Sequence, residues 1–218
     1  MVDGYLMHHG IKGQKWGVRR YQNEDGSYTE EGLQRRKEIT NYGREGGTIK
    51  KGSNLYRVSI NKEDPTLGRR KYVSTNEWDN ALWEDNLIGG YRKKYPNLDM
   101  YGVKYKTIKD IKIAKQTEIG KATCDILKKN PNIGKITVYE LMEKDQKNFN
   151  KIDFSNPTSI GTFSIRNSTR LGEEIVNEML KSGYGGVADG LGYNVSNDPL
   201  IIFDPDKKMK KVSTVKYE

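Results

Sequence analysis

Two adjacent histidines, His8 and His9, are the first residues of this sequence whose chemistry suggests a site, because imidazole is a common ligand of zinc and other transition metals. Adjacent side chains do not easily reach one ion together, and the chain contains no other histidine. The single cysteine, Cys124, can form neither a thiolate cluster nor an intrachain disulfide, which fits a reducing compartment such as bacterial cytoplasm. The sequence therefore predicts no metal site.

The segment KGQKWGVRR combines one aromatic side chain with closely spaced cations. Trp16 lies between the lysines Lys12 and Lys15 and the arginines Arg19 and Arg20. Trp and Arg side chains are enriched at the centres of protein interfaces, and the same combination can stack on bases or hold phosphates. A basic tail with one aromatic anchor is the simpler alternative, and the residues alone leave both interpretations open.

Other arrangements typical of catalysis are weak. No Ser, His and Asp constellation for nucleophilic catalysis is found, since both histidines lie near the N-terminus. The stretch GYGGVADGLG has the glycine content of a phosphate-binding loop, yet it follows a predicted helix instead of linking a strand to a helix. Asp189 within it fits a turn, where Asp is frequent because it bonds its own backbone.

Composition limits the classes of protein that this chain can represent. Its 218 residues allow one ordinary domain with an appendage, or two small domains. Lys and Arg exceed Asp and Glu by 38 to 29, but the cations are spread along the chain, so we do not predict specific nucleic-acid recognition. No segment approaches the roughly 20 apolar residues of a membrane-spanning helix, and the first residues lack a secretory signal. We expect a soluble protein with no membrane partner.

The domain boundaries follow from glycine spacing and from a change in composition. Glycines interrupt residues 4–32 too often for a long helix and predict a string of turns, with a short helix in EEGLQRRKEI. The loose stretch NYGREGGTIKKGSN then predicts a boundary near Ser53. We therefore expect a motif segment over residues 1–35, a linker over 36–53 and an α+β domain over 54–218.

Short runs rich in Tyr, Val and Ile predict the strands of this domain. The first are NLYRVSI, KYVST, MYGVKYKTI and IKIA; the later ones are GGVADG, PLIIFD and VSTVKY. PLIIFD is apolar enough for a central strand, whereas VSTVKY suits an edge.

Two helices are predicted between the early and the late strands. Thr137 and Glu140 have the spacing of a capping box at the start of TVYELMEKD. A second, amphipathic helix follows from apolar residues that recur every four positions at Leu171, Ile175 and Met179. The order of strands, helices and strands predicts an α+β fold with a mixed or antiparallel sheet and flanking helices.

The stretch from His8 to Gly32 closely resembles a short N-terminal motif, HHGIKGQKWGVRRYQN followed by a turn and an acidic Gly-ended segment, that recurs in phage and prophage proteins of Firmicutes. The resemblance implies phage origin, often beside structural or head-associated genes. Our hypothesis is that residues 8–32 are a docking tag for a phage structural or head protein. Trp16, Arg19 and Arg20 would then make the central contacts.

Residues 54–218 more distantly resemble ADP-ribosyltransferase-like domains of phage proteins. NLYRVS looks like the first strand of that family, YVSTN like its Ser-Thr strand, and GYGGVADG with DPLIIFDP like its closing strands. The resemblance implies NAD as cofactor, with Arg57 holding its pyrophosphate and with Ser74 and Thr75 lining the nicotinamide pocket. It also implies that LYRVS and YVST are neighbouring strands that line one cleft, with PLIIF close by.

The chain departs from the family at the acidic residue that is expected to act on the cofactor ribose. The family usually presents a Glu in an E-x-E or Q-x-E arrangement near the closing strand, whereas this chain has Asp198 there. Asp is one methylene shorter, and a misplacement of about 1 Å can cost roughly a hundredfold in rate. We therefore expect weak or absent NAD turnover.

Two classes of function follow from the two resemblances. In the first, the chain is a virion- or head-associated protein whose domain is structural or binds a partner. In the second, it is a phage-delivered effector that uses NAD to ADP-ribosylate a host protein. The expected location is accordingly the virion or the cytoplasm of the bacterial host.

Overall fold

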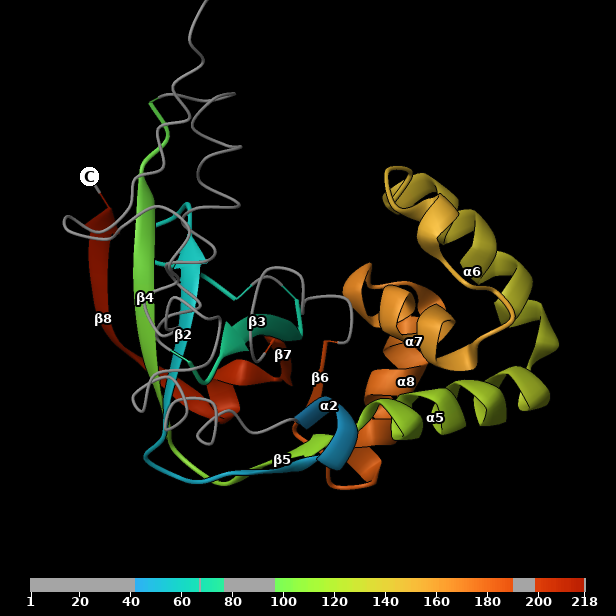
Figure 1. Ribbon diagram of the computed structural model, residues 1–218, viewed down its shortest axis with the longest axis horizontal. Coiled ribbons are helices and arrows are strands. Elements are labelled where there is room, and N and C mark those ends of the chain that lie inside the picture. The colour runs from blue at the N-terminus through green and yellow to red at the C-terminus, as the bar shows by residue number, and fades with distance from the viewer. Residues whose placement is uncertain (1–41, 67, 77–96, 190–198, 218) are drawn as a thin grey trace, which may run out of the picture. The chain divides into compact units, whose positions relative to one another are not determined.

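The computed structural model describes residues 42–66, 68–76, 97–189 and 199–217. They belong to one compact unit, Asn41–Glu218. A mixed eight-stranded sheet and a group of helices build this unit, which confirms the α+β prediction (Figure 1). The N-terminal motif with Trp16, Arg19 and Arg20 lies outside the described residues, as does Asp198.

The strands follow one another across the sheet in the order β1-β5-β6-β7-β3-β2-β4-β8. β5 and β6 are parallel, and the other neighbouring pairs of described strands are antiparallel. A parallel pair needs a long crossover connection, and helices α5 to α8 supply it between β5 and β6. The strand bounds are β1 Gly47–Ile49, β2 Asn54–Ser59, β3 Arg70–Ser74, β4 Met100–Thr107, β5 Ile111–Ala114, β6 Gly186–Ala188, β7 Pro199–Phe203 and β8 Met209–Tyr217.

Four of the helices pack together beside one face of the sheet (Figure 1). α8 has the predicted form, since the side chain of Thr169 accepts a hydrogen bond from the Gly172 amide at its start and its apolar stripe is buried. The helix bounds are α2 Tyr42–Glu45, α5 Gln116–Lys129, α6 Pro131–Lys144, α7 Pro157–Arg166 and α8 Arg170–Lys181.

The predicted capping box at Thr137 is wrong. α6 begins at Pro131, whose fixed backbone suits the first helical position, so Thr137 lies in the helix interior. Its hydroxyl donates to the Ile133 carbonyl at 2.7 Å instead of capping a helix start. Of the helices longer than one turn, α5 and α7 were not predicted. α7 starts where the Asn156 side chain accepts from two backbone amides, directly before Pro157.

The central strand β7 is buried on both faces, as its apolar sequence predicted. Leu200 and Ile202 pack in one hydrophobic cluster, which includes Leu55 and Val73. Ile201 and Phe203 face the opposite way and pack against the helices. β8, predicted as an edge, ends the order of described strands.

Regular structure begins earlier than Ser53. Within residues 36–53, which composition assigned to a linker, Tyr42–Glu45 forms a helical turn and Gly47–Ile49 pairs with β5. The side chains of Tyr42 and Ile49 are buried in the cluster that contains Leu55. A strand of only three residues joins the sheet through backbone pairing, which composition does not reveal.

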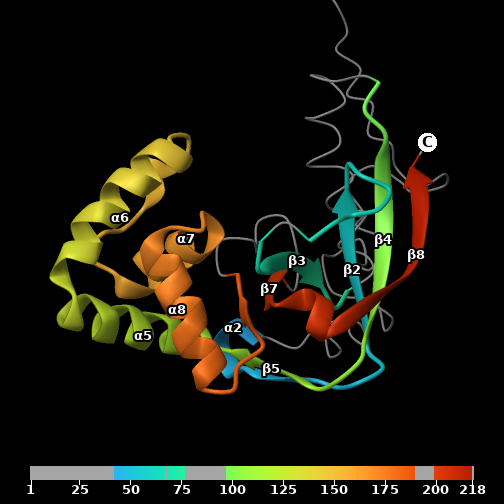
Figure 2. The ribbon, with the colours of Figure 1, turned by 180° about the vertical axis from the view of Figure 1, so that it is seen from behind.

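The sheet splits between β2 and β3. These strands pair only at Tyr56 and Ser74. By contrast, the whole length of β2 pairs with β4, and the whole length of β3 pairs with β7. We call β1, β5, β6, β7 and β3 the inner half-sheet, and β2, β4 and β8 the outer half-sheet. Their strands run in clearly different directions, as the view from behind also shows (Figure 2).

Candidate functional site

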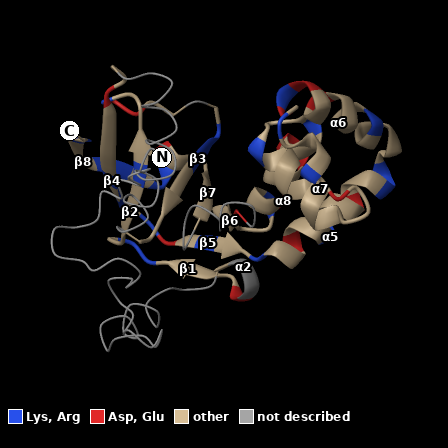
Figure 3. Ribbon diagram, turned by 45° about the horizontal axis from the view of Figure 1, so that its top comes forward, with Lys and Arg blue, Asp and Glu red and all other residues tan. Residues whose placement is uncertain are grey.

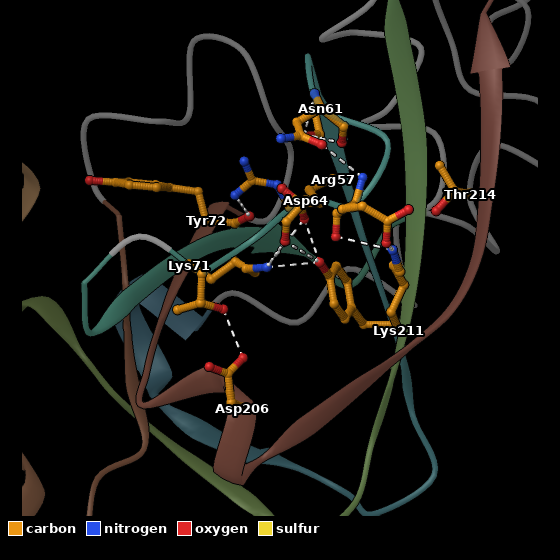
Figure 4. Close-up of polar contacts among 12 residues, drawn as sticks. Arg57, Asn61, Asp64, Lys71, Tyr72, Asp206, Lys211 and Thr214 are labelled. Atoms are coloured by element: carbon orange, nitrogen blue, oxygen red, sulfur yellow. Dashed lines mark hydrogen bonds and ion pairs between the residues drawn. The ribbon is translucent and has the colours of Figure 1, made fainter.

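Arg57 reaches across the split between the two half-sheets. It follows Tyr56, the residue at which β2 pairs with β3. Its Nη1 donates to the backbone carbonyl of Tyr72 on β3 at 3.3 Å (Figure 4). Where the strands diverge, a β3 carbonyl thus finds its partner in a side chain of β2 instead of in the β2 backbone.

A tight turn after β2 brings Asp64 back to Arg57. The Ser59 hydroxyl donates to the Asn61 carbonyl at 2.9 Å, and the Asp64 amide donates to the same carbonyl at 3.0 Å. Asp64 itself has a φ of 45°, a left-handed conformation that Asp and Asn adopt more readily than most residues. The turn buries the carboxylate, whose side chain is 3% exposed.

The Asp64 carboxylate is surrounded by two cations and a phenol. Arg57 Nε lies 3.1 Å from Oδ2, Lys71 Nζ donates to Oδ2 at 3.3 Å, and the Tyr105 hydroxyl donates to the same oxygen. Lys71 also donates to the Asp64 carbonyl at 2.7 Å and to the Tyr105 hydroxyl at 2.8 Å (Figure 4). We call Arg57, Asp64, Lys71 and Tyr105 the Asp64 cluster; it joins β2, β3 and β4.

Burial governs the protonation of this cluster. Desolvation lowers the pKa of Lys71, and the nearby carboxylate of Asp64 opposes this shift. Desolvation also raises the pKa of Tyr105, and its hydrogen bond to Asp64 raises the pKa further. Tyr105 is therefore a neutral phenol at physiological pH and acts as a hydrogen-bond donor.

The contact between Arg57 and Asp64 is an ion pair without good hydrogen-bond geometry. Although Arg57 Nε is 3.1 Å from the carboxylate, this buried nitrogen has no aligned hydrogen-bond acceptor. An unsatisfied buried donor costs about 1–3 kcal/mol, so the attraction of opposite charges must offset this penalty. About a quarter of the side chain stays exposed, 23%.

Ser74 lies on the other side of β3 from the Asp64 cluster. Side chains alternate along a strand, so Lys71 and Ser74, three positions apart, point to opposite faces. Ser74 is fully buried, and its hydroxyl accepts from the Asn76 amide at 2.9 Å. The structure thus places Arg57 and Ser74 on neighbouring strands but does not bring their side chains to one face. Thr75, half-buried, directly follows β3.

A second polar group occupies the face of β3 that carries Ser74. The Tyr72 hydroxyl donates to the Arg166 carbonyl at 3.2 Å, and Arg166 Nη1 lies 3.8 Å from the buried carboxylate of Asp189. Burial, reinforced by Asp189, raises the pKa of Tyr72 to about 12. These contacts attach α7 to the inner half-sheet, and they give the predicted turn residue Asp189 an ionic partner.

Contacts from β8 and from Asp206 hold the turn that carries Asp64 from outside. Lys211 on β8 pairs with Glu63 at 2.9 Å, and Thr66 donates to Asp206 at 2.8 Å (Figure 4). Both contacts lie at the surface, where a single ion pair or hydrogen bond contributes little to stability. Their role is to fix the turn against β8 and against the 3-10 turn Pro205–Lys207 that precedes β8.

Sequence reasoning did not identify Asp64, Lys71 or Tyr105. Lys71 carried the best signal, because a lysine flanked by residues of a buried strand must find a partner for its charge. Asp64 precedes Pro65 and lies outside the predicted strands, so no pattern marked it. Among the residues that the structure describes, no group of His, Cys, Asp and Glu could hold a metal ion.

No helix in the described part of the chain is both long and apolar enough to cross a membrane. Comparison with known proteins gives a match over the N-terminal segment. A model described as a family of unknown function (DUF7211) matches residues 1–23, which include the segment KGQKWGVRR with Trp16. No curated protein and no solved structure matches the chain.

Proposed function

We propose that this chain is a bacteriophage-encoded, virion- or head-associated protein. Residues 8–32 dock it to another phage component, and its α+β domain serves as a binding or structural module with little or no enzymatic activity. The observation that carries the proposal is the set of contacts that the Arg57 side chain makes within the domain. Its guanidinium is committed to Asp64 and to the Tyr72 carbonyl, and Ser74 lies on the opposite face of β3.

The commitment of Arg57 bears directly on NAD chemistry. A pyrophosphate is held best by two parallel N–H groups of one guanidinium. In this domain Nη1 is directed to a backbone carbonyl and Nε faces the Asp64 carboxylate. A nucleotide at the split would have to compete with a buried anion for the same cation, which disfavours tight binding.

The second candidate is a phage-delivered effector that transfers ADP-ribose from NAD to a host protein. One observation favours it: β2, β3 and β7 are consecutive neighbours, as the resemblance to ADP-ribosyltransferase-like domains requires. Arg57 also retains some exposure at the split. On this proposal Asp198, which precedes β7 in the sequence, would act on the cofactor ribose, and Ser74 and Thr75 would support the pocket.

Incubation of the purified full chain with labelled NAD and host lysate separates the two candidates. The first predicts label transfer no greater than that of a lysate without the chain. The second predicts robust transfer that Asp198→Ala abolishes. Asp125→Ala is the matched control, because Asp125 is exposed on α5, away from β2, β3 and β7. Transfer that survives in the control but not in Asp198→Ala would contradict the first proposal.

A further inference from the structure

Among the described strands, β8 is the edge of the outer half-sheet, and most of its side chains are exposed. It is the last strand in the order and pairs with β4, and it spans nine residues. Only Met209 is buried; Val212 and Val215 are 53% and 62% exposed. An edge strand offers a row of N–H and C=O groups to any extended chain that can lie beside it.

All charged residues in the strands of the outer half-sheet are basic. Its three strands contain no Asp or Glu and carry the cations Arg57, Lys104, Lys106, Lys210, Lys211 and Lys216 (Figure 3). Acids from the adjoining turns reach some of them: Asp64 pairs with Arg57, Glu63 with Lys211 and Asp99 with Lys216. The cations that these acids do not reach, Lys104, Lys106 and Lys210, lie on β8 or on its neighbour β4.

Lys106 and Lys210 face each other across β4 and β8. Like charges directly opposite on neighbouring strands repel. Both lysines are exposed, and within the described ranges neither pairs with a carboxylate. This arrangement leaves two ammonium groups beside the edge that an acidic residue of a partner would neutralise together.

A register shift in β8 brings Lys210 and an apolar side chain to the same face of the strand. Lys104 pairs with Ser213 but Tyr105 pairs with Lys211, so Val212 is the extra residue of a bulge. On the far side of the bulge, Ser213 and Val215 therefore share a face with Lys210. The edge presents a cationic pair near its beginning and an exposed valine near its end, on one face.

The lysines disfavour pairing of β8 with a second copy of itself. In an antiparallel pair centred on Ser213, Lys210 would lie opposite Lys216 of the other copy, and such charges oppose association. Lysines on an edge protect it against self-pairing in general. The same charges attract an extended segment that carries carboxylates.

We propose that β8 is a docking edge for an extended acidic segment of a partner protein, which adds as a strand beside it. A carboxylate of that segment lies beside Lys106 and Lys210, and an apolar side chain contacts Val215. Backbone bonds supply affinity and the charge supplies selectivity, as in other cases of strand addition. The inference does not depend on docking through residues 8–32.

A synthetic peptide that alternates Glu with Val and Thr tests this inference on the full chain. We expect it to bind and to slow hydrogen exchange at alternate amides of β8, the signature of a new strand. Lys210→Glu should weaken binding about fivefold or more, because it replaces an attraction by a repulsion. Lys135→Glu, which makes the same change at an exposed position of α6, should leave the affinity unchanged.

Three outcomes would overturn the inference. They are the absence of peptide binding, binding without protection of β8 amides, and equal effects of the two substitutions. A single-stranded oligothymidylate of the same charge is tested in parallel. If it protects β8 amides and the peptide does not, the surface recognises nucleic acid instead of an acidic strand.

Discussion

The carboxylate of Asp64 neutralises two cations that the fold places on neighbouring strands. Arg57 comes from β2 and Lys71 from β3, where the backbone ladder between these strands has almost ended. Lys71 is 4% exposed, so without Asp64 its ammonium would be buried with only neutral acceptors. We infer that the cluster replaces backbone pairing as the link between the half-sheets.

Asp64→Asn should therefore lower the free energy of unfolding by about 3 kcal/mol or more, the usual cost of removing one partner of a buried ion pair. Asn also tolerates the left-handed backbone, so the substitution changes the charge and not the turn. Denaturant unfolding measures the difference. Asp206→Asn is the control, because Asp206 is an exposed acceptor for Thr66 and its loss should cost less than about 1 kcal/mol. Equal losses in the two variants would refute a structural role for the cluster.

At the scale of elements, α8 links the sheet to the helical layer. Leu171, Ile175 and Met179 are buried against the inner half-sheet cluster that includes Ile201 and Phe203. The Thr169 hydroxyl accepts from the Gly172 amide at 3.1 Å and so fixes where the helix begins. Thr169 is itself completely buried, so no water can replace this bond.

Thr169→Ala should lower the free energy of unfolding by about 1–2 kcal/mol through the loss of this cap. Thr169→Ser keeps the hydroxyl and removes only a methyl group, so it isolates the hydrogen bond from packing. In thermal or denaturant unfolding, we expect the serine variant to keep most of the stability that the alanine variant loses. A serine variant as unstable as the alanine variant would show that packing, not capping, is the role of Thr169.

The elements also show what sequence patterns can predict. β2, β4 and β7 follow from alternating or continuous apolar residues, and α8 follows from its apolar stripe. α5 was missed because Thr, Gly and Lys dilute its apolar stripe. The start of α6 was misplaced because Thr137 and Glu140 have the spacing of a capping box, although the helix already begins at Pro131.

The candidate site was less predictable for a physical reason. Arg57 and Ser74 were found on their strands, but which faces they occupy depends on pairing between segments distant in sequence. The positions of Lys71 and Tyr105 around Asp64 depend on the split between β2 and β3. Local patterns carry no information about where a ladder stops.

At the scale of the whole described unit, the two half-sheets differ in character. In the inner half-sheet, β7 is buried on both faces and packs against the helices. The outer half-sheet carries lysines and an exposed edge strand. The inner half-sheet thus forms the stable core, and the outer half-sheet offers a surface for contacts. This division agrees with the proposed role in binding.

The central claim, that the chain joins a virion through residues 8–32, is tested most directly by counting its copies in purified particles. Wild-type chain and the Trp16→Ala variant would be produced from the encoding phage and quantified by mass spectrometry. The proposal predicts a loss of about tenfold or more in the variant, because buried Trp anchors contribute at least 2 kcal/mol at interface centres. Lys135→Ala, on the exposed face of α6, should be incorporated at the wild-type level. Wild-type copy number in the Trp16→Ala particles, or no chain in wild-type particles, would contradict the proposal.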